Sequence, residues 1–128
     1  MKYEKATDME ERVKEVISKL RMDHVEWENI SCIRSFGSTS NAIARCHALG
    51  KVMQLALERR AFYVLEFVSE KFDSLPEDEK TRVIIHELMH IPKSFGGGFR
   101  HHDFVNRKNV ETLYREFQRQ NNSERWKI

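Results

Sequence analysis

Three residues between positions 86 and 90 have the types and the spacing for acid–base chemistry at a bound ion. His86 and His90 are four residues apart, so on an α-helix both imidazoles lie on one face and reach the same ion. Glu87 directly follows the first histidine, which places its carboxylate beside the ion rather than on it. A base in that place takes a proton from metal-bound water. The HExxH pattern therefore predicts a Zn²⁺ site with Glu87 as the general base.

The segment around this motif resembles the zincin metallopeptidases. Residues 83–92 (VIIHELMHIP) and 97–103 (GGFRHHD) are similar to the small archaeal and phage metallopeptidases, and more distantly to SprT-like proteases and gluzincins. The resemblance runs from Ser31 to Phe117, and its specific part from Leu75 to Tyr114. It implies an upper strand ahead of the motif helix that lines the substrate cleft, and Tyr63 to Val68 occupies that place.

A third metal ligand must follow the motif helix, and three residues compete for this role. The metzincin pattern is excluded, because the position six after the second motif histidine is Gly96. His102 lies beyond the glycine turn, and its context resembles the family pattern Leu-Arg-x-His with Phe99 in place of Leu, so it is the preferred candidate. His101 is its immediate neighbour. Glu111 is the gluzincin-like alternative, and if it is not a ligand it is expected to orient a ligand imidazole.

These residues predict a zinc-dependent metallopeptidase. His86, His90 and the third ligand would hold Zn²⁺ and leave one position for water. Glu87 would accept a proton as that water attacks a peptide carbonyl, and would then pass it to the leaving amine. Arg100 is a candidate for binding a substrate carboxylate or the developing oxyanion, and a solvated loop arginine is the alternative interpretation.

Two other functions fit the same sequence. A DNA-associated protease of the SprT-like kind is suggested by the basic C-terminal third, which has 8 basic and 4 acidic residues from Lys93 to Ile128. No zinc finger, helix-turn-helix signal or Arg/Lys run supports nucleic acid as a partner. A non-catalytic, metal-stabilised interaction module would use both His101 and His102 to close the site, but it would not need Glu87. A resting form blocked by the tail beyond Asn121 would have the same sequence.

Length and composition restrict the class of protein. The chain has 128 residues, 33% of them charged and 40% hydrophobic, which indicates one globular domain over 1–128 and excludes a mostly disordered chain. No apolar run is long enough to cross a membrane, and the charged N-terminus lacks a signal peptide, so a cytoplasmic protein is expected. Cys32 and Cys46 are too few for a disulfide framework and are predicted to be small buried residues, with their pairing left open.

Periodicity predicts an α+β fold in which a small, mostly antiparallel sheet packs on two long helices. The expected elements, in chain order, are an N-terminal helix within 1–22 (periodic from Thr7), strands Ile30–Phe36 and Ile43–Leu49 paired as a hairpin, an ambiguous segment Val52–Leu57, a strand Phe62–Val68, a helix that starts with a capping box at Ser74 and runs to Ile91, a helix Arg107–Gln120, and a tail 121–128.

Overall fold

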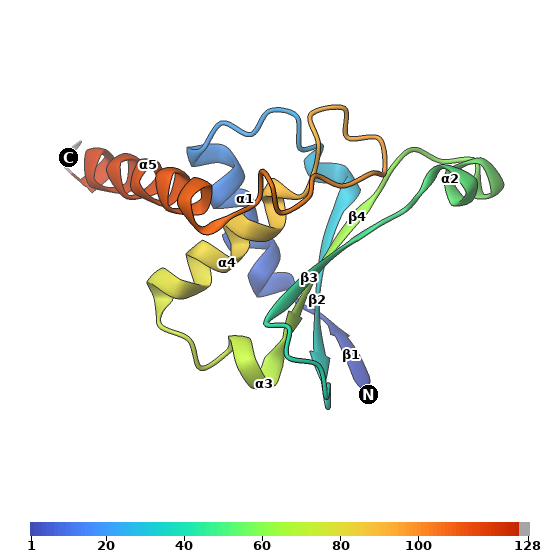
Figure 1. The fold of residues 1–128 in the computed structure, drawn as a ribbon, viewed down its shortest axis with the longest axis horizontal. Helices are drawn as coiled ribbons and strands as arrows, with labels where there is room; N and C mark the ends of the chain where they lie inside the picture. The colour runs from blue at the N-terminus through green and yellow to red at the C-terminus, as the bar shows by residue number, and fades with distance from the viewer. Residues whose placement is uncertain (126–128) are drawn as a thin grey trace.

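The computed structural model describes residues 1–125, and it has the expected α+β architecture (Figure 1). Its elements, in chain order, are β1 (Lys2–Lys5), α1 (Thr7–Lys19), a 3₁₀ turn (Trp27–Asn29), β2 (Ile30–Phe36), β3 (Ala44–Ala48), α2 (Lys51–Leu57), β4 (Tyr63–Val68), α3 (Ser69–Phe72), α4 (Glu77–Met89) and α5 (Arg107–Arg125). Within the described residues, no helix is both long enough and apolar enough to cross a membrane.

The four strands form one sheet in the order β1-β2-β4-β3. The outer pairs, β1 with β2 and β3 with β4, are antiparallel, whereas β2 and β4 are parallel. The predicted hairpin between Ile30–Phe36 and Ile43–Leu49 is therefore wrong, because β4 lies between these two strands. The burial of the strands explains this order. Five of the six β4 residues are buried, as expected for an inner strand, whereas the β3 residues are partly buried or exposed.

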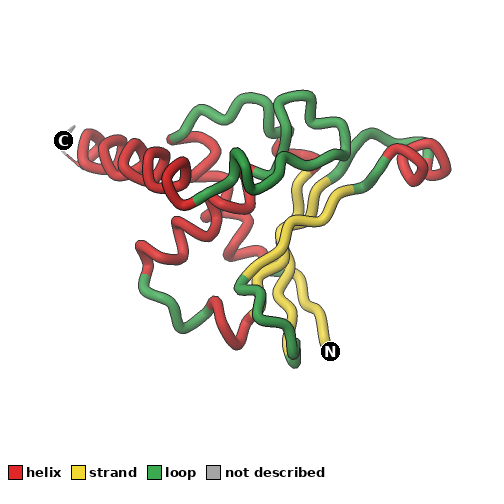
Figure 2. The backbone as a smooth tube through the Cα atoms, in the orientation of Figure 1, coloured by secondary structure: helices red, strands yellow, loops and turns green. Residues whose placement is uncertain are grey.

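One face of the sheet forms the hydrophobic core with the helices. Tyr63, Leu65 and Phe67 of β4 are fully buried on this face, together with Val13 of α1 and Ile84 of α4. Figure 2 shows the helical layer beside the strands, with α2 set apart at one end of the sheet. The core thus fixes α4, which carries the HExxH motif, against the strands that precede it in the chain.

The N-terminal helix predicted within 1–22 begins at Thr7, where its periodicity starts, but it ends earlier than expected. Residues Lys2–Lys5 are strand β1, which pairs with β2 at the edge of the sheet, and α1 covers only Thr7–Lys19. All four β1 residues are exposed, so they lack the alternation of apolar and polar side chains that reveals a half-buried strand. This strand forms through backbone hydrogen bonds to β2, which the amino-acid composition of the segment does not reveal.

Two other boundaries differ from the sequence prediction, and one ambiguous segment adopts one of its two alternatives. Helix α4 begins after Pro76, which is the N-cap and provides no side-chain cap, so the capping box at Ser74 is wrong. The ambiguous segment Val52–Leu57 is helical, within α2. Helix α5 continues through the first five residues of the predicted tail, and residues 126–128 lie outside the described part of the chain.

Candidate metal centre

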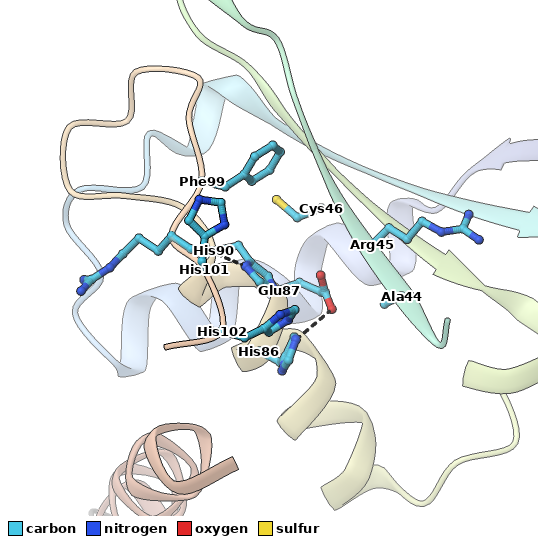
Figure 3. Close-up of a pocket in the computed structure, with 10 residues that line it drawn as sticks. Ala44, Arg45, Cys46, His86, Glu87, His90, Phe99, His101 and His102 are labelled. Carbon is cyan, nitrogen blue, oxygen red and sulfur yellow. Dashed lines mark hydrogen bonds and ion pairs between the residues drawn. The ribbon is translucent and has the colours of Figure 1, made fainter. Parts of the chain in front are cut away.

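The structure brings together three imidazoles from two segments of the chain (Figure 3). His86 lies in the last turn of α4, His90 caps its C-terminus, and His102 lies on the loop before α5. One ring nitrogen from each histidine lies within 4.8 Å of the other two. The ring centroids are 5.1 to 5.7 Å apart. Three imidazole nitrogen donors at this spacing fit a Zn²⁺ ion in chemistry and number.

A backbone carbonyl orients one of these imidazoles. His90 Nδ1 lies 2.7 Å from the carbonyl oxygen of Arg100, while the amide nitrogen of Arg100 donates to the carbonyl of His90 at 2.7 Å. A hydrogen bond from Nδ1–H to a carbonyl leaves Nε2 with the free lone pair that a metal needs. Arg100 therefore supports the histidine cluster through its backbone. Its guanidinium lies 3.2 Å from the ring centroid of Phe104.

Glu87 lies beside the cluster in an environment of low polarity. The residue is 6% exposed, and Oε2 lies 3.9 Å from Nε2 of His86. Burial raises the pKa of Glu87 to about 7. Burial also lowers the pKa of His86, and the neighbouring His90 and His102 lower it further. The neutral imidazole that results is the form that binds a metal.

The other two candidates for the third ligand are placed differently. The Glu111 carboxylate accepts hydrogen bonds from Nε of Arg82 at 3.0 Å and from Nη2 at 3.2 Å, and Arg82 lowers its pKa. The Glu111 carboxylate is therefore bound to Arg82 of α4, which lies about one helical turn before His86. His101 lines the cleft, but it does not belong to the group of ligand atoms formed by the other three histidines. The arrangement favours His102 as the third ligand.

A glycine turn carries His102 to its position, and two side chains hold that turn. The Tyr63 hydroxyl accepts a hydrogen bond from the Gly97 amide at 2.9 Å and donates one to the Gly98 carbonyl at 2.8 Å. Gln54 of α2 donates from Nε2 to the carbonyls of Leu49 and Gly96 at 2.7 and 2.9 Å. The turn is therefore tied both to the inner strand β4 and to α2.

Gly97 cannot be replaced in this turn without strain. Its φ is +100°, and a Cβ atom there would lie 2.5 Å from Nε2 of Gln54 and 2.6 Å from the carbonyl oxygen of Leu49. We expect Gly97→Ala to lower the free energy of unfolding by about 1–3 kcal/mol from backbone strain alone and to weaken metal binding. Gly98→Ala is the matched control, since nothing lies within 4 Å of its Cβ position. Equal chemical denaturation midpoints for the two variants would contradict this.

The histidines open into a cleft along the edge of the sheet. A cavity of about 340 Å³ is bounded by the metal-site residues and by Ala44 and Cys46 of β3, with Phe99 at one side (Figure 3). A second groove of about 520 Å³ shares His86 and Glu87 with it. The strand that lines the cleft is therefore β3. The expectation that Tyr63–Val68 lines it is wrong, because none of the residues that bound this cavity belongs to β4, which lies inside the sheet.

A family model described as putative phage metallopeptidase matches residues 1–126 of the chain. The chain belongs to this family. The resemblance drawn from the sequence is thereby confirmed, and the family description implies a metal-dependent peptidase. Searches of curated proteins and of solved structures gave no match.

In this member of the phage metallopeptidase family, sequence reasoning missed several residues that shape the site. The Arg100 carbonyl and the Tyr63 hydroxyl act through contacts that no motif encodes. Cys46 was expected to be a small buried residue, yet it is only partly buried and lines the cleft, where burial and then the charge of Glu87 raise its pKa to about 12. Cys32 is buried, as expected, and both cysteines are free. They lie on strands separated by β4.

Proposed function

We propose that this protein is a zinc-dependent peptidase in which His86, His90 and His102 hold Zn²⁺ and Glu87 is the general base. The supporting observation is the group of three imidazole nitrogens within 4.8 Å of one another, beside a buried carboxylate and open to a cleft. When bound, Zn²⁺ supplies Lewis acidity, which lowers the pKa of a coordinated water and polarises a substrate carbonyl.

The position of Glu87 supports its role in proton transfer. Its side chain lines both cavities, so it faces the space in which a peptide would lie. A carboxyl group that is buried and has a pKa raised to about 7 exchanges protons near neutral pH. We infer that Glu87 accepts the proton of the attacking water and passes it to the leaving amine.

The free edge of β3 supports a peptide as the substrate. The Val68 amide donates to Ile43, and the Leu49 amide donates to Phe62, so the odd-numbered residues of this segment point their backbone groups towards β4. By alternation, Ala44, Cys46 and Ala48 point theirs away from β4, towards the cleft. Their side chains are small, which leaves room for an extended peptide to pair with this edge as an added strand.

Metal analysis tests this proposal. We expect close to one Zn²⁺ per chain after reconstitution, loss of peptide hydrolysis on chelation, and recovery when zinc is returned. His86→Ala should lose the bound zinc, whereas His47→Ala, a change on the opposite face of the sheet, should retain it. Folded protein that takes up no zinc, or hydrolysis that is indifferent to a chelator, would refute the proposal.

A further inference from the structure

Helix α2 exposes almost all of its apolar side chains. Its sequence is KVMQLAL, and among its seven residues only Gln54 is partly buried. Val52 and Leu55 are each 82% exposed, and Met53 and Leu57 are exposed by half or more. We call these four residues the apolar tip. A helix that is apolar on all sides is normally covered, and a cluster of exposed large apolar side chains marks a binding surface.

The apolar tip continues the line of the cleft. Helix α2 directly follows β3, the strand whose free edge lines the cleft, and Figure 1 shows it projecting beyond the end of β3 and β4. Phe99, 42% exposed, lines the cleft just after the glycine turn. Gln54 joins that turn to α2 through Gly96. A polypeptide lying along β3 past Phe99 therefore meets α2 next.

We propose that the apolar tip binds apolar side chains of the substrate chain at a distance from the bond that is cut. This inference rests on the proposed peptidase function, and it adds a preference for extended substrates with an apolar stretch on one side of the scissile bond. A strand advances about 3.3 Å per residue, so the five steps from Cys46 to Lys51 span about 16 Å. The apolar stretch should therefore lie about four to six residues from the scissile bond.

The size of the surface favours a substrate segment over a second copy of this chain. A seven-residue helix is about 10 Å long, and its exposed sides amount to far less than the roughly 800 Å² that each partner buries in a stable complex. Such a patch adds affinity to a contact made elsewhere, here the cleft.

The test uses two labelled peptides with the same central sequence. The long peptide carries Leu and Phe at four to six residues on both sides of the centre, and the short peptide ends before those positions. Binding is measured on the zinc-loaded Glu87→Gln protein, and hydrolysis on the protein with Glu87 intact. The variant is Val52→Ser with Leu55→Ser, two highly exposed positions. Tyr3→Ser, at an exposed apolar residue of β1, is the matched control.

We expect the long peptide to bind about 10- to 100-fold more tightly than the short one, and the double variant to remove most of this difference. The short peptide should bind the variant as before, because it does not reach α2. Equal affinities for the two peptides would overturn the inference, as would a variant that loses both. A variant that only turns a dimer into a monomer would also overturn it. The hydrolysis measurement tests the peptidase function independently of the binding measurement. If the long peptide binds through the apolar tip but is not hydrolysed, the peptidase function is refuted while the apolar tip remains a binding surface.

Discussion

Glu87→Gln is expected to lower peptide hydrolysis by about 10²- to 10⁴-fold, the usual contribution of a positioned general base. Glutamine has nearly the same shape but cannot accept the proton. The metal should remain, because the three imidazole nitrogens do not include this side chain. The fold should remain as well, because burial already disfavours the charged form of Glu87, and an amide replaces it without a buried charge.

The comparison requires both rate and metal content for the same preparations. Zinc per chain, circular dichroism and the unfolding midpoint should match those of the protein with Glu87. Glu77→Gln is the matched control, since it makes the same chemical change on the same helix at a carboxylate that is paired with Arg12 and lines neither cavity of the site. Unchanged hydrolysis in Glu87→Gln would show that another residue is the base or that the activity belongs to a contaminant.

The second large effect is expected at His102. If its imidazole is the third ligand, His102→Ala leaves only the two histidines of the HExxH helix, and zinc affinity falls strongly. His101→Ala should change it little, because this neighbour lies outside the group of close ligand atoms. Glu111→Gln should also change it little, because its carboxylate is held by Arg82. Competition titration with a chelating dye measures all three affinities.

If the losses of zinc affinity follow the reverse order, the metal centre has a different set of ligands. If Glu111→Gln weakens zinc binding and His102→Ala does not, the site is of the gluzincin type. In that case Arg82 would have to release the Glu111 carboxylate on metal binding. A strong loss in both His101→Ala and His102→Ala would instead indicate a closed, four-ligand site, as in the non-catalytic module considered from the sequence.

The parts of the site that the sequence predicts are those set by local geometry. His86 and His90 meet because four residues make about one turn of a helix, and the helix is recognisable from its apolar spacing. The third ligand is different, because His101 and His102 are adjacent and only the path of the glycine turn decides which one faces the helix. That path depends on Tyr63 and Gln54, which are distant in sequence.

The order of the strands in the sheet also depends on contacts between residues that are distant in sequence. Strands β2, β3 and β4 were recognisable from their own residues, but the order of the strands was not, because pairing depends on non-local contacts. Strand β1 was missed because its residues are all exposed. Strand β4 was assigned to the cleft because it precedes the motif helix in the chain, as the cleft strand does in the family that the sequence resembles. The binding of nucleic acid by the basic C-terminal third and the cytoplasmic location remain predictions.

The order of the strands has a consequence for how the chain folds. Strand β4 is the last of the four in the sequence, yet it lies between β2 and β3. When the ribosome has made β2 and β3, β2 can pair only with β1 on one side and β3 has no partner, so both wait for residues Tyr63–Val68 before the two pairs with β4 can close. Closing long loops is slow relative to forming a local hairpin. The wall of the cleft is therefore built late, and an incomplete chain that stops before β4 presents unpaired strands prone to association.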